Sequence, residues 1–599
     1  DGAFNEGAPV ACGAGGCFET GRNWHYVWTR DTAYSVDLAL AALDPTRARN
    51  SLELKLSERR GGGDLQIVQD TGTGGSYPVS SDRVSWALGA SRLLDFLDGA
   101  ERTAFRDRAF EAVRNTVEHD RLVVFDPADG LYTGEQSFLD WREQSYPDWT
   151  AADTVHIGMS KSLSTNLLHL HALSLAAALA AEKSDEPARA RYQGWADALR
   201  EAIRARFWLP EEKLFSSFST TFLDPAPTRR YDLLASAFAV LLGVADEAQA
   251  KEVLSSYPHA GKGPPTLWPQ QQATAIYHNR SSWPFVTAYW LEAARVARND
   301  KVVNHGVWSL VRGAALNLSN MENFELVTGA NWLEEGATSG PVVNSQRQLW
   351  SVAGYLAMVQ SVVFGLETSP QGIRFLPYVT RELRNSVFGG ADSIVLNNFP
   401  YRGRRLTVVV RLPERVRSNE GAYTVGSVEL NGADAGTGFL PAERLAAENP
   451  LEITLAEATE SGSAMRVVAD TSVWRDLFGP KTPTIDAITI EGGKLKLALG
   501  TGGEAAADIA FRVYRDGELA VADLAGSAGA WLDPTSGDHL SKTRCYAVES
   551  YFLASGNASQ RSRPNCFWGR DDARVRIVSA RDFRNIGGDP VVEHGRFHF

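Results

Sequence analysis

Apolar residues recur at helical spacing as far as residue 364 of this 599-residue chain. The spacing predicts about eleven helices of ordinary length. They lie over residues 31–43, 46–58, 80–97, 101–119, 163–182, 188–206, 230–243, 246–256, 283–297, 301–317 and 343–364. Strand signals, which alternate with a period of two, are scarce in this region. Residues 1–370 are therefore predicted to form one helical domain.

Short and long links alternate between the predicted helices. The long links, 60–79, 120–160, 257–282 and 318–342, are rich in glycine, proline and aromatic residues. Long loops without secondary structure in a compact domain are usually functional. The alternation therefore predicts helical hairpins arranged in a ring, with the long loops gathered at one end.

The pattern changes near Gly372 and becomes strand-like. Segments such as SIVLNNFPYRGRRLTVVVRLPE, GSVELNG and LEITLAE alternate between apolar and polar positions. They predict an all-β domain over 371–478 and a second β-sandwich over 479–568. The tail, 569–599, is expected to extend one of these sandwiches. The length of the chain agrees with this division into about three large domains.

Composition excludes several classes of partner. The formal net charge is −12 and no basic stripe is present, which argues against nucleic acids and anionic membrane surfaces. No run of about 18 uninterrupted apolar residues predicts a membrane span. Sixteen tryptophans are many, and although most are expected in the core, their flat faces suit sugar rings. The oligomeric state stays open.

The four cysteines form two local pairs, Cys12 with Cys17 and Cys545 with Cys566. No Cys-x-x-Cys motif or nearby histidine cluster indicates zinc, so two disulfides are the favoured interpretation, with free thiols as the alternative. Disulfides imply an oxidising compartment, so a secreted or periplasmic protein is expected. Because residue 1 is not methionine, we expect that a signal peptide has been removed.

Two loops carry clustered carboxylates beside aromatic residues. The first acid loop, Gly134–Trp149, holds four carboxylates and four aromatic residues within sixteen positions. Aromatic neighbours can raise the pKa of an acid, although these acids could instead pair with Arg142 in a solvated loop. The second acid loop, Met321–Glu335, holds Glu322, Glu325, Glu334 and Glu335 next to Trp332, before an apolar helix.

Paired carboxylates on such loops are typical of glycoside cleavage. One carboxylic acid protonates the leaving oxygen, and the other activates water or attacks directly. No cofactor is needed. A calcium ion is possible because acids are scattered along the chain, but no loop has the spacing that would demand one. Within the second acid loop, helix capping explains Glu334 and Glu335 better than it explains Glu322.

Two further segments could hold a sugar. In Trp28-Thr29-Arg30-Asp31, Arg30 can donate to sugar hydroxyls and Asp31 can accept from them, although a helix cap also explains Asp31. The segment Tyr277–Pro284 offers His278, Asn279 and Trp283 as residues of a pocket wall. A histidine in such a place is more often structural when it stands alone.

These four pieces, in this order, resemble the six-hairpin (α/α)6 glycosidases. Residues 26–31, YVWTRD, are similar to the Trp-Thr-Arg-Asp motif of glucoamylases, whose Arg and Asp hold the terminal sugar. Residues 322–329, ENFELVTG, followed by Leu349-Trp350-Ser351, resemble a stretch of the glucosidase I and mannosylglycerate hydrolase group. The leading Glu is the general base there, which points to Glu322.

The acid in this resemblance has two candidates. Phe138-Leu139-Asp140-Trp141 resembles the acid-bearing stretch of the glucosidase I group and of glycogen-debranching glucosidases, which points to Asp140. Glucoamylases place a Glu after the Trp, so Glu143 is the alternative. Neither the Arg142-Glu143-Gln144 run nor the doubled Glu334-Glu335 matches these families. Their β-domain often precedes the barrel, which leaves open a further domain upstream of this chain.

The resemblance implies a mainly α (α/α)6 toroid as the catalytic domain, followed by all-β sandwich domains. It implies an exo-acting, inverting glycoside hydrolase on an oligosaccharide or polysaccharide, with an α-glucoside favoured. The sugar pocket would be formed by Arg30, Asp31, Trp28, Trp141, His278, Asn279, Trp283 and Trp332. The segments 511–517 and 546–551 resemble a fibronectin type III domain. The alternatives are a polysaccharide lyase with Tyr146 or His156 as base, and a non-catalytic carbohydrate-binding protein.

Overall fold

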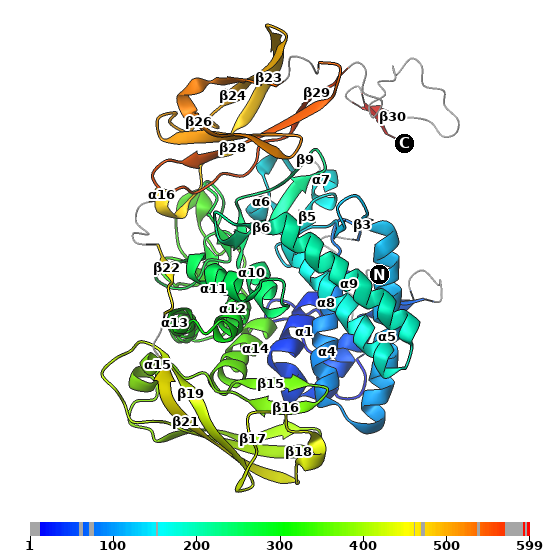
Figure 1. The fold of residues 1–599 in the computed structure, drawn as a ribbon, viewed down its shortest axis with the longest axis vertical. Helices are drawn as coiled ribbons and strands as arrows, with labels where there is room; N and C mark the ends of the chain where they lie inside the picture. The colour runs from blue at the N-terminus through cyan, green and yellow to red at the C-terminus, as the bar shows by residue number, and fades with distance from the viewer. Residues whose placement is uncertain are drawn as a thin grey trace.

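The computed structural model describes residues 12–58, 64–70, 77–150, 154–459, 462–468, 474–535, 540–569, 591–593 and 596–598. Its helices are grouped in the middle of the molecule (Figure 1). A five-stranded sheet lies at one end of the long axis, and the strands of the C-terminal region lie at the other end.

Six largely apolar inner helices form a closed ring. They are α1 (Thr29–Ser35), α4 (Trp86–Phe96), α8 (Leu163–Glu182), α10 (Leu233–Leu241), α12 (Pro284–Val296) and α14 (Leu349–Ala357). Each contacts the next in this order, and α14 contacts α1. α1 continues through the π-helix η2 (Val36–Leu40) into α2 (Ala41–Leu43), and α14 continues as the π-helix η8 (Met358–Val363). Neighbours on both sides bury these helices, which explains their apolar composition.

Among the described residues, five outer helices cover this ring. They are α3 (Pro45–Leu54), α5 (Gly99–Val123), α9 (Glu186–Phe207), α11 (Glu247–Ser256) and α13 (Asp300–Asn317). Each buries one face and exposes the other, as amphipathic helices do. Short links join them to inner helices, and Asp185 and Asn299 cap α9 and α13. The predicted fold class, an (α/α)6 barrel followed by β-domains, is confirmed.

By length and composition alone, α8 could cross a membrane, but 83% of its most apolar window is buried inside the protein. It forms part of the inner ring and contacts α5 and α9 on its outer side. Burial within the barrel therefore accounts for its apolar sequence.

Several predicted helices differ from the structure at their ends. The helix predicted over 80–97 becomes α-helical only at Trp86, and the one predicted over 101–119 runs from Gly99 to Val123. The helix predicted over 46–58 ends at Leu54, since Lys55 turns inward to form a buried ion pair with Asp70 at 3.2 Å. The helix predicted from residue 343 begins only at Leu349.

Short strand pairs, which the sequence pattern did not indicate, join the links between helices. They are β1 (Leu56–Glu58) with β2 (Leu65–Ile67), β3 (Phe125–Asp126) with β4 (Leu131–Tyr132), β6 (Trp208–Leu209) with β7 (Leu214–Phe215), β10 (Tyr231–Asp232) with β12 (Leu267–Trp268), and the three-stranded set β5 (Lys161–Ser162), β8 (Phe218–Thr221) and β9 (Asp224–Pro227). β13 (Ser281–Ser282) pairs with β14 (Phe324–Glu325), which brings the segment after His278 against the second acid loop. Short helical turns complete these links: η5 (Asp82–Ser85), α6 (Arg142–Ser145), η6 (Asp148–Thr150), α7 (Thr154–Gly158) and η7 (Gly336–Thr338).

The first β-region follows the barrel and shares its core. A hairpin, β15 (Leu366–Ser369) and β16 (Gly372–Phe375), and the short helix α15 (Arg381–Ser386) lead into a sheet of order β17 (Ser393–Tyr401), β18 (Arg404–Arg411), β21 (Glu448–Thr459), β19 (Ala422–Leu430), β20 (Ala433–Asp434). β18 runs parallel to β21, and the other neighbours are antiparallel. Further on, β22 (Arg466–Val467) pairs with β11 (Pro258–His259), and η9 (Ala442–Arg444) and α16 (Trp474–Leu477) are short turns.

The C-terminal sandwich has two antiparallel sheets around a core of its own. One sheet has the order β23 (Thr484–Glu491), β24 (Lys494–Gly500), β27 (Ala530–Leu532), and the other has the order β26 (Glu518–Ala525), β25 (Ile509–Arg515), β28 (Arg544–Phe552), β29 (Asn565–Phe567), with the turn η10 (Gly526–Ala528). The predicted β-rich character is confirmed, and the fibronectin type III resemblance stays a prediction.

Both predicted disulfides are present, Cys12–Cys17 and Cys545–Cys566, and the second joins β28 to β29. Within the predicted tail extension, β30 (Val591–Glu593) pairs with β31 (Arg596–His598). Most of the rest of 569–599 lies outside the described residues, as do parts of the predicted long loop 60–79.

A buried ion pair ties the wall of the barrel to the link that precedes α4. Arg83 lies 2.5 Å from Asp120 of α5, His169 of α8 lies 3.2 Å from the same carboxylate, and all three side chains are fully buried. Burial opposes ionisation, but Arg83 and His169 lower the pKa of Asp120 to about 2. This network fixes Arg83, which directly follows Asp82 in the chain.

Asp120→Ala is expected to lower the free energy of unfolding of the barrel by about 3–5 kcal/mol, because Arg83 is left as an unpaired buried charge. Urea denaturation followed by far-ultraviolet circular dichroism measures this loss. Glu118→Ala is the matched control, since Glu118 on the same helix pairs with Arg191 at the surface, where such pairs contribute less than about 1 kcal/mol. Equal losses in the two variants would contradict the prediction.

Candidate active site

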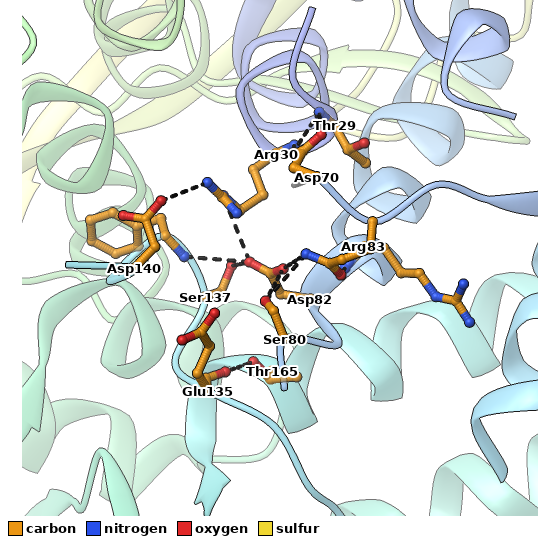
Figure 2. Close-up of polar contacts among 12 residues, drawn as sticks. Thr29, Arg30, Asp70, Ser80, Asp82, Arg83, Glu135, Ser137, Asp140 and Thr165 are labelled. Atoms are coloured by element: carbon orange, nitrogen blue, oxygen red, sulfur yellow. Dashed lines mark hydrogen bonds and ion pairs between the residues drawn. The ribbon is translucent and has the colours of Figure 1, made fainter. Parts of the chain in front are cut away.

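The inner helix α1 begins with a buried arginine that joins two acidic loops. Arg30 Nη2 lies 3.0 Å from Asp140 Oδ2, and its Nε lies 3.8 Å from Asp82 Oδ2 (Figure 2). The start of α1 is fixed because the Thr29 amide donates to both carboxylate oxygens of Asp70, each at 2.9 Å. Asp70 therefore holds the backbone of the WTRD segment, and the Arg30 side chain reaches Asp140 on the first acid loop.

Asp140 lies on the first acid loop and remains accessible, with 17% of its side chain exposed. Burial raises the pKa of Asp140 above its ordinary value, and the charge of Arg30 opposes the rise. Asp82 holds the loop, since its Oδ2 accepts a hydrogen bond of 2.9 Å from the Ser137 hydroxyl. On another side of Asp140, His278 Nε2 lies 4.0 Å from Oδ1.

Glu322 on the second acid loop is almost fully buried and is held by three donors. It accepts hydrogen bonds from the Tyr277 hydroxyl at 2.9 Å, the Ser345 amide at 2.9 Å and Trp24 Nε1 at 3.4 Å. Burial raises the pKa of Glu322, and these hydrogen bonds partly oppose the rise. The charge of Asp140 adds to it, which shows that the two carboxylates lie within electrostatic reach.

Asp31 is a third carboxylate in the same cluster. Burial raises the pKa of Asp31 well above its ordinary value, against the pull of Arg30. The charges of Glu322 and Asp140 add to the rise. Gln348 Nε2 donates to Asp31 Oδ1 at 3.3 Å, whereas Oδ2 has no hydrogen-bond partner among the described residues. This oxygen is a buried acceptor whose hydrogen-bonding capacity the described residues leave unused.

Aromatic rings surround the three carboxylates. Tyr277 stacks on His278 with ring centres 4.5 Å apart, and Trp141 packs against Tyr277 at 4.6 Å. Trp28 packs against Trp24 at 5.4 Å, and both are partly exposed. These rings offer apolar faces of the kind that sugars stack on.

His278 is fully buried, and neither of its ring nitrogens has a hydrogen-bond partner among the described residues. Burial, with a contribution from the charge of Arg30, lowers the pKa of His278 to about 3. The imidazole is therefore neutral at physiological pH, and it can donate to or accept from a hydroxyl group.

Two predicted site residues lie outside this cluster. Glu143, the alternative acid, is exposed on α6. Trp332 is half exposed, and its Nε1 donates to Glu334 at 3.2 Å. Neither side chain forms a hydrogen bond or ion pair with Asp140 or Glu322 among the described residues.

Two other predicted residues support the wall from behind. The Asn279 side chain is buried and accepts from the Gln271 amide at 2.7 Å. Trp283 is buried, and its Nε1 donates to the Tyr277 carbonyl at 3.0 Å and to the Ser281 hydroxyl at 2.8 Å. These contacts hold the segment that carries Tyr277.

The alternative interpretation of the first acid loop is a solvated loop whose acids pair with Arg142. Glu135 does pair with Arg142, but it is buried and not solvated. Arg142 Nε lies 2.7 Å from Glu135, which is 1% exposed. Burial raises the pKa of Glu135 to about 7 in spite of this pairing.

The residues named for the lyase alternative have other partners. The Tyr146 hydroxyl accepts from the Gln136 amide, and His156 Nδ1 lies 2.9 Å from the Thr221 hydroxyl. In the part of the chain that the structure describes, no group of three or more His, Cys, Asp or Glu residues could hold a metal ion.

The sequence interpretation missed several contributors to the cluster, namely Trp24, Asp82, Tyr277, Ser345 and Gln348. Tyr277 belongs to the segment 277–284, and Trp24 lies two residues before the YVWTRD segment, so proximity in sequence could have indicated them. Asp82 and Gln348 have no local signal, because only the closure of the ring brings them to Arg30 and Asp31.

No family model and no curated protein matches this chain, whereas solved structures do. A GH63 mannosylglycerate hydrolase from Thermus thermophilus, in complex with Tris and D-glycerate, is 13% identical with a TM-score of 0.45, over 58% of this chain and 97% of that one. A bacterial glucoamylase complexed with acarbose is 18% identical with a TM-score of 0.38, over 56% and 49%. The neutral trehalase of Saccharomyces cerevisiae is 13% identical with a TM-score of 0.39, over 55% and 70%.

Identities of this size concern the fold alone. With TM-scores below 0.5 these likenesses carry no further argument, and the (α/α)6 barrel rests on the closed ring of helices in this structure.

Proposed function

We propose that this protein is an exo-acting, inverting glycoside hydrolase. One observation carries the proposal: two carboxylates with raised pKa, the partly buried Asp140 and the buried Glu322, lie on separate loops around the Arg30–Asp31 pair. Buried acids with perturbed pKa values in one cluster are typical of catalytic sites. No metal or cofactor is part of this proposal.

Asp140 is the proposed general acid. Its raised pKa keeps a fraction of it protonated, and its partial exposure leaves it within reach of a glycosidic oxygen. It gives its proton to this oxygen as the bond to the anomeric carbon breaks. Arg30 then stabilises the carboxylate that remains.

Glu322 is the proposed general base. Three hydrogen-bond donors fix its orientation, and each favours the ionised form. It takes a proton from a water molecule, whose oxygen attacks the anomeric carbon on the face opposite the leaving group. One bond forms as the other breaks, and the configuration inverts, which requires the two carboxyl groups to lie about 6.5–9.5 Å apart.

Arg30, Asp31 and His278 are proposed to hold the terminal sugar. The unpartnered Asp31 oxygen and the neutral His278 nitrogens can bind hydroxyl groups, and Trp28 and Trp141 can cover the ring. An α-glucoside is the favoured substrate, supported by the likeness of the WTRD segment to glucoamylases. The two disulfides support a secreted or periplasmic location.

The test is hydrolysis of a panel of α- and β-linked disaccharides, with the anomer of the released sugar followed by nuclear magnetic resonance. The expected result is release of the non-reducing-end sugar with inverted configuration. Retention of configuration would make one of the two carboxylates a nucleophile and overturn the mechanism. Failure to cleave any neutral glycoside would overturn the function.

The pH dependence of kcat/KM is expected to be bell-shaped. Its rising limb follows ionisation of Glu322 and lies above the ordinary glutamate value of 4.5, because burial raises that pKa. Its falling limb follows loss of the Asp140 proton and lies above the ordinary aspartate value of 3.8 for the same reason. A profile that rises with pH without a falling limb would contradict the assignment of Asp140 as acid.

A further inference from the structure

The C-terminal sandwich is fixed to the barrel by a buried cluster of charges. Arg561 is fully buried and lies 3.3 Å from Asp224 of β9 and 3.4 Å from Glu549 of β28. Glu549 also lies 3.0 Å from Arg512 and 3.6 Å from Arg229 of the barrel. These ion pairs join side chains of the barrel to side chains of the C-terminal sandwich.

Beside this cluster, one side chain of the sandwich reaches into the barrel loops. Gln560 is 3% exposed, and its Nε2 donates to the Ser145 carbonyl at 3.1 Å and to Gln271 Oε1 at 3.2 Å. Ser145 belongs to the first acid loop, and Gln271 belongs to the segment that leads to His278. Gln560 therefore contacts both walls of the candidate site from behind.

Hydrogen bonds continue from Ser145 to the proposed acid. The Ser145 hydroxyl donates to the carbonyl of Leu139 at 3.0 Å. Leu139 immediately precedes Asp140, so this bond fixes the backbone from which the proposed acid projects.

A second path of hydrogen bonds runs from Gln271. Its backbone amide donates to Asn279 Oδ1 at 2.7 Å, and its side chain donates to the Gln144 carbonyl. The backbone amide of Asn279 donates in turn to Gln144 Oε1 at 3.0 Å. Gln144 and Asn279 thus tie the first acid loop to the residue that follows His278.

We infer that Gln560 is a positioning residue, through which the C-terminal sandwich holds the first acid loop and the His278 segment in register. This inference rests on the proposed function, because it gives the sandwich a role in placing Asp140 against Glu322. The sandwich is then part of the catalytic scaffold, in addition to any role in binding. Displacement of the acid is expected to reduce stabilisation of the transition state more than it reduces the affinity for substrate.

The test compares Gln560→Leu with Gln272→Leu in the full-length protein. Gln272 also joins the barrel to the sandwich, since its Nε2 donates to the Gly479 carbonyl and to Glu504, each at 2.9 Å. It lies outside the two paths described above. Each substitution removes one donor from the same interface, so a general loss of docking would affect both alike.

Gln560→Leu is expected to lower kcat on a cleaved disaccharide by about tenfold, with KM changed by less than about twofold. Gln272→Leu is expected to keep both constants within about twofold of the wild type. Equal losses in the two variants, or a Gln560→Leu enzyme with unchanged kcat, would overturn the inference.

Hydrogen exchange measured by mass spectrometry provides a readout that does not depend on catalysis. Gln560→Leu is expected to speed amide exchange in residues 134–149 and 270–280, and Gln272→Leu is not. Unchanged exchange in both variants would overturn the inference even if the wild type cleaves glycosides. A wild type without activity would overturn the proposed function alone, because the exchange comparison would still decide whether Gln560 orders these loops.

Discussion

Glu322→Gln is expected to lower kcat by about 10³-fold, the scale of general base catalysis, while substrate still binds. The substitution keeps the shape of the side chain and its contacts with Tyr277 and Ser345, but it removes the group that accepts the proton of water. Steady-state kinetics on the disaccharide that the panel identifies gives kcat, and calorimetric titration of the variant with the same sugar gives its affinity.

Glu334→Gln is the matched control on the same loop. Glu334 is exposed and accepts from Trp332 and Ser339, so its loss is expected to change kcat by less than about twofold. If Glu322→Gln retained more than a tenth of the wild-type kcat, Glu322 would not be the base. If Glu334→Gln were the inactive variant, the assignment within the second acid loop would be wrong.

The helices of the barrel could be predicted from the sequence because their buried positions are apolar and recur at helical spacing. The helix predicted over 163–182 coincides with α8, and the one over 301–317 differs from α13 by a single residue. Both are long, and their apolar positions are set by the ring itself. Local signals such as Pro284 at the start of α12 add to this period.

Errors in these helices occur where polar tertiary contacts replace the local preference. Residues 343–348 are included in the predicted helix, yet they are polar after Val343 and are not helical. The Ser345 amide instead donates to Glu322, and Gln348 donates to Asp31. The chain at this point is shaped by the site, and no local periodicity encodes such contacts.

The candidate site was predictable where chemistry is dense in the sequence. Asp140 stands among aromatic residues on its loop, and Glu322 opens a motif. Its electrostatic frame was not predictable, because Asp70 and Asp82 reach Arg30 only after the ring closes. The same holds for Gln560, which is more than 400 positions away from the loop that it contacts.

Asp140→Asn is expected to lower kcat by about 10²–10³-fold on a disaccharide, whose leaving alcohol needs a proton. On a glycosyl fluoride of the same sugar, the loss is expected to stay within about tenfold, because fluoride departs without general acid help. This contrast is specific to an acid, since a base or a binding residue would be needed equally for both substrates. Initial rates on the two substrates, measured for the variant and the wild type, give the comparison.

Glu143→Gln separates the two candidates for the acid. Glu143 is exposed on α6, three positions from Asp140, so the control tests the same loop with the same loss of charge. It is expected to keep both rates within about twofold of the wild type. If Glu143→Gln shows the contrast between disaccharide and fluoride while Asp140→Asn loses both substrates equally, then Glu143 donates the proton. Asp140 would in that case serve to hold Arg30 and the terminal sugar.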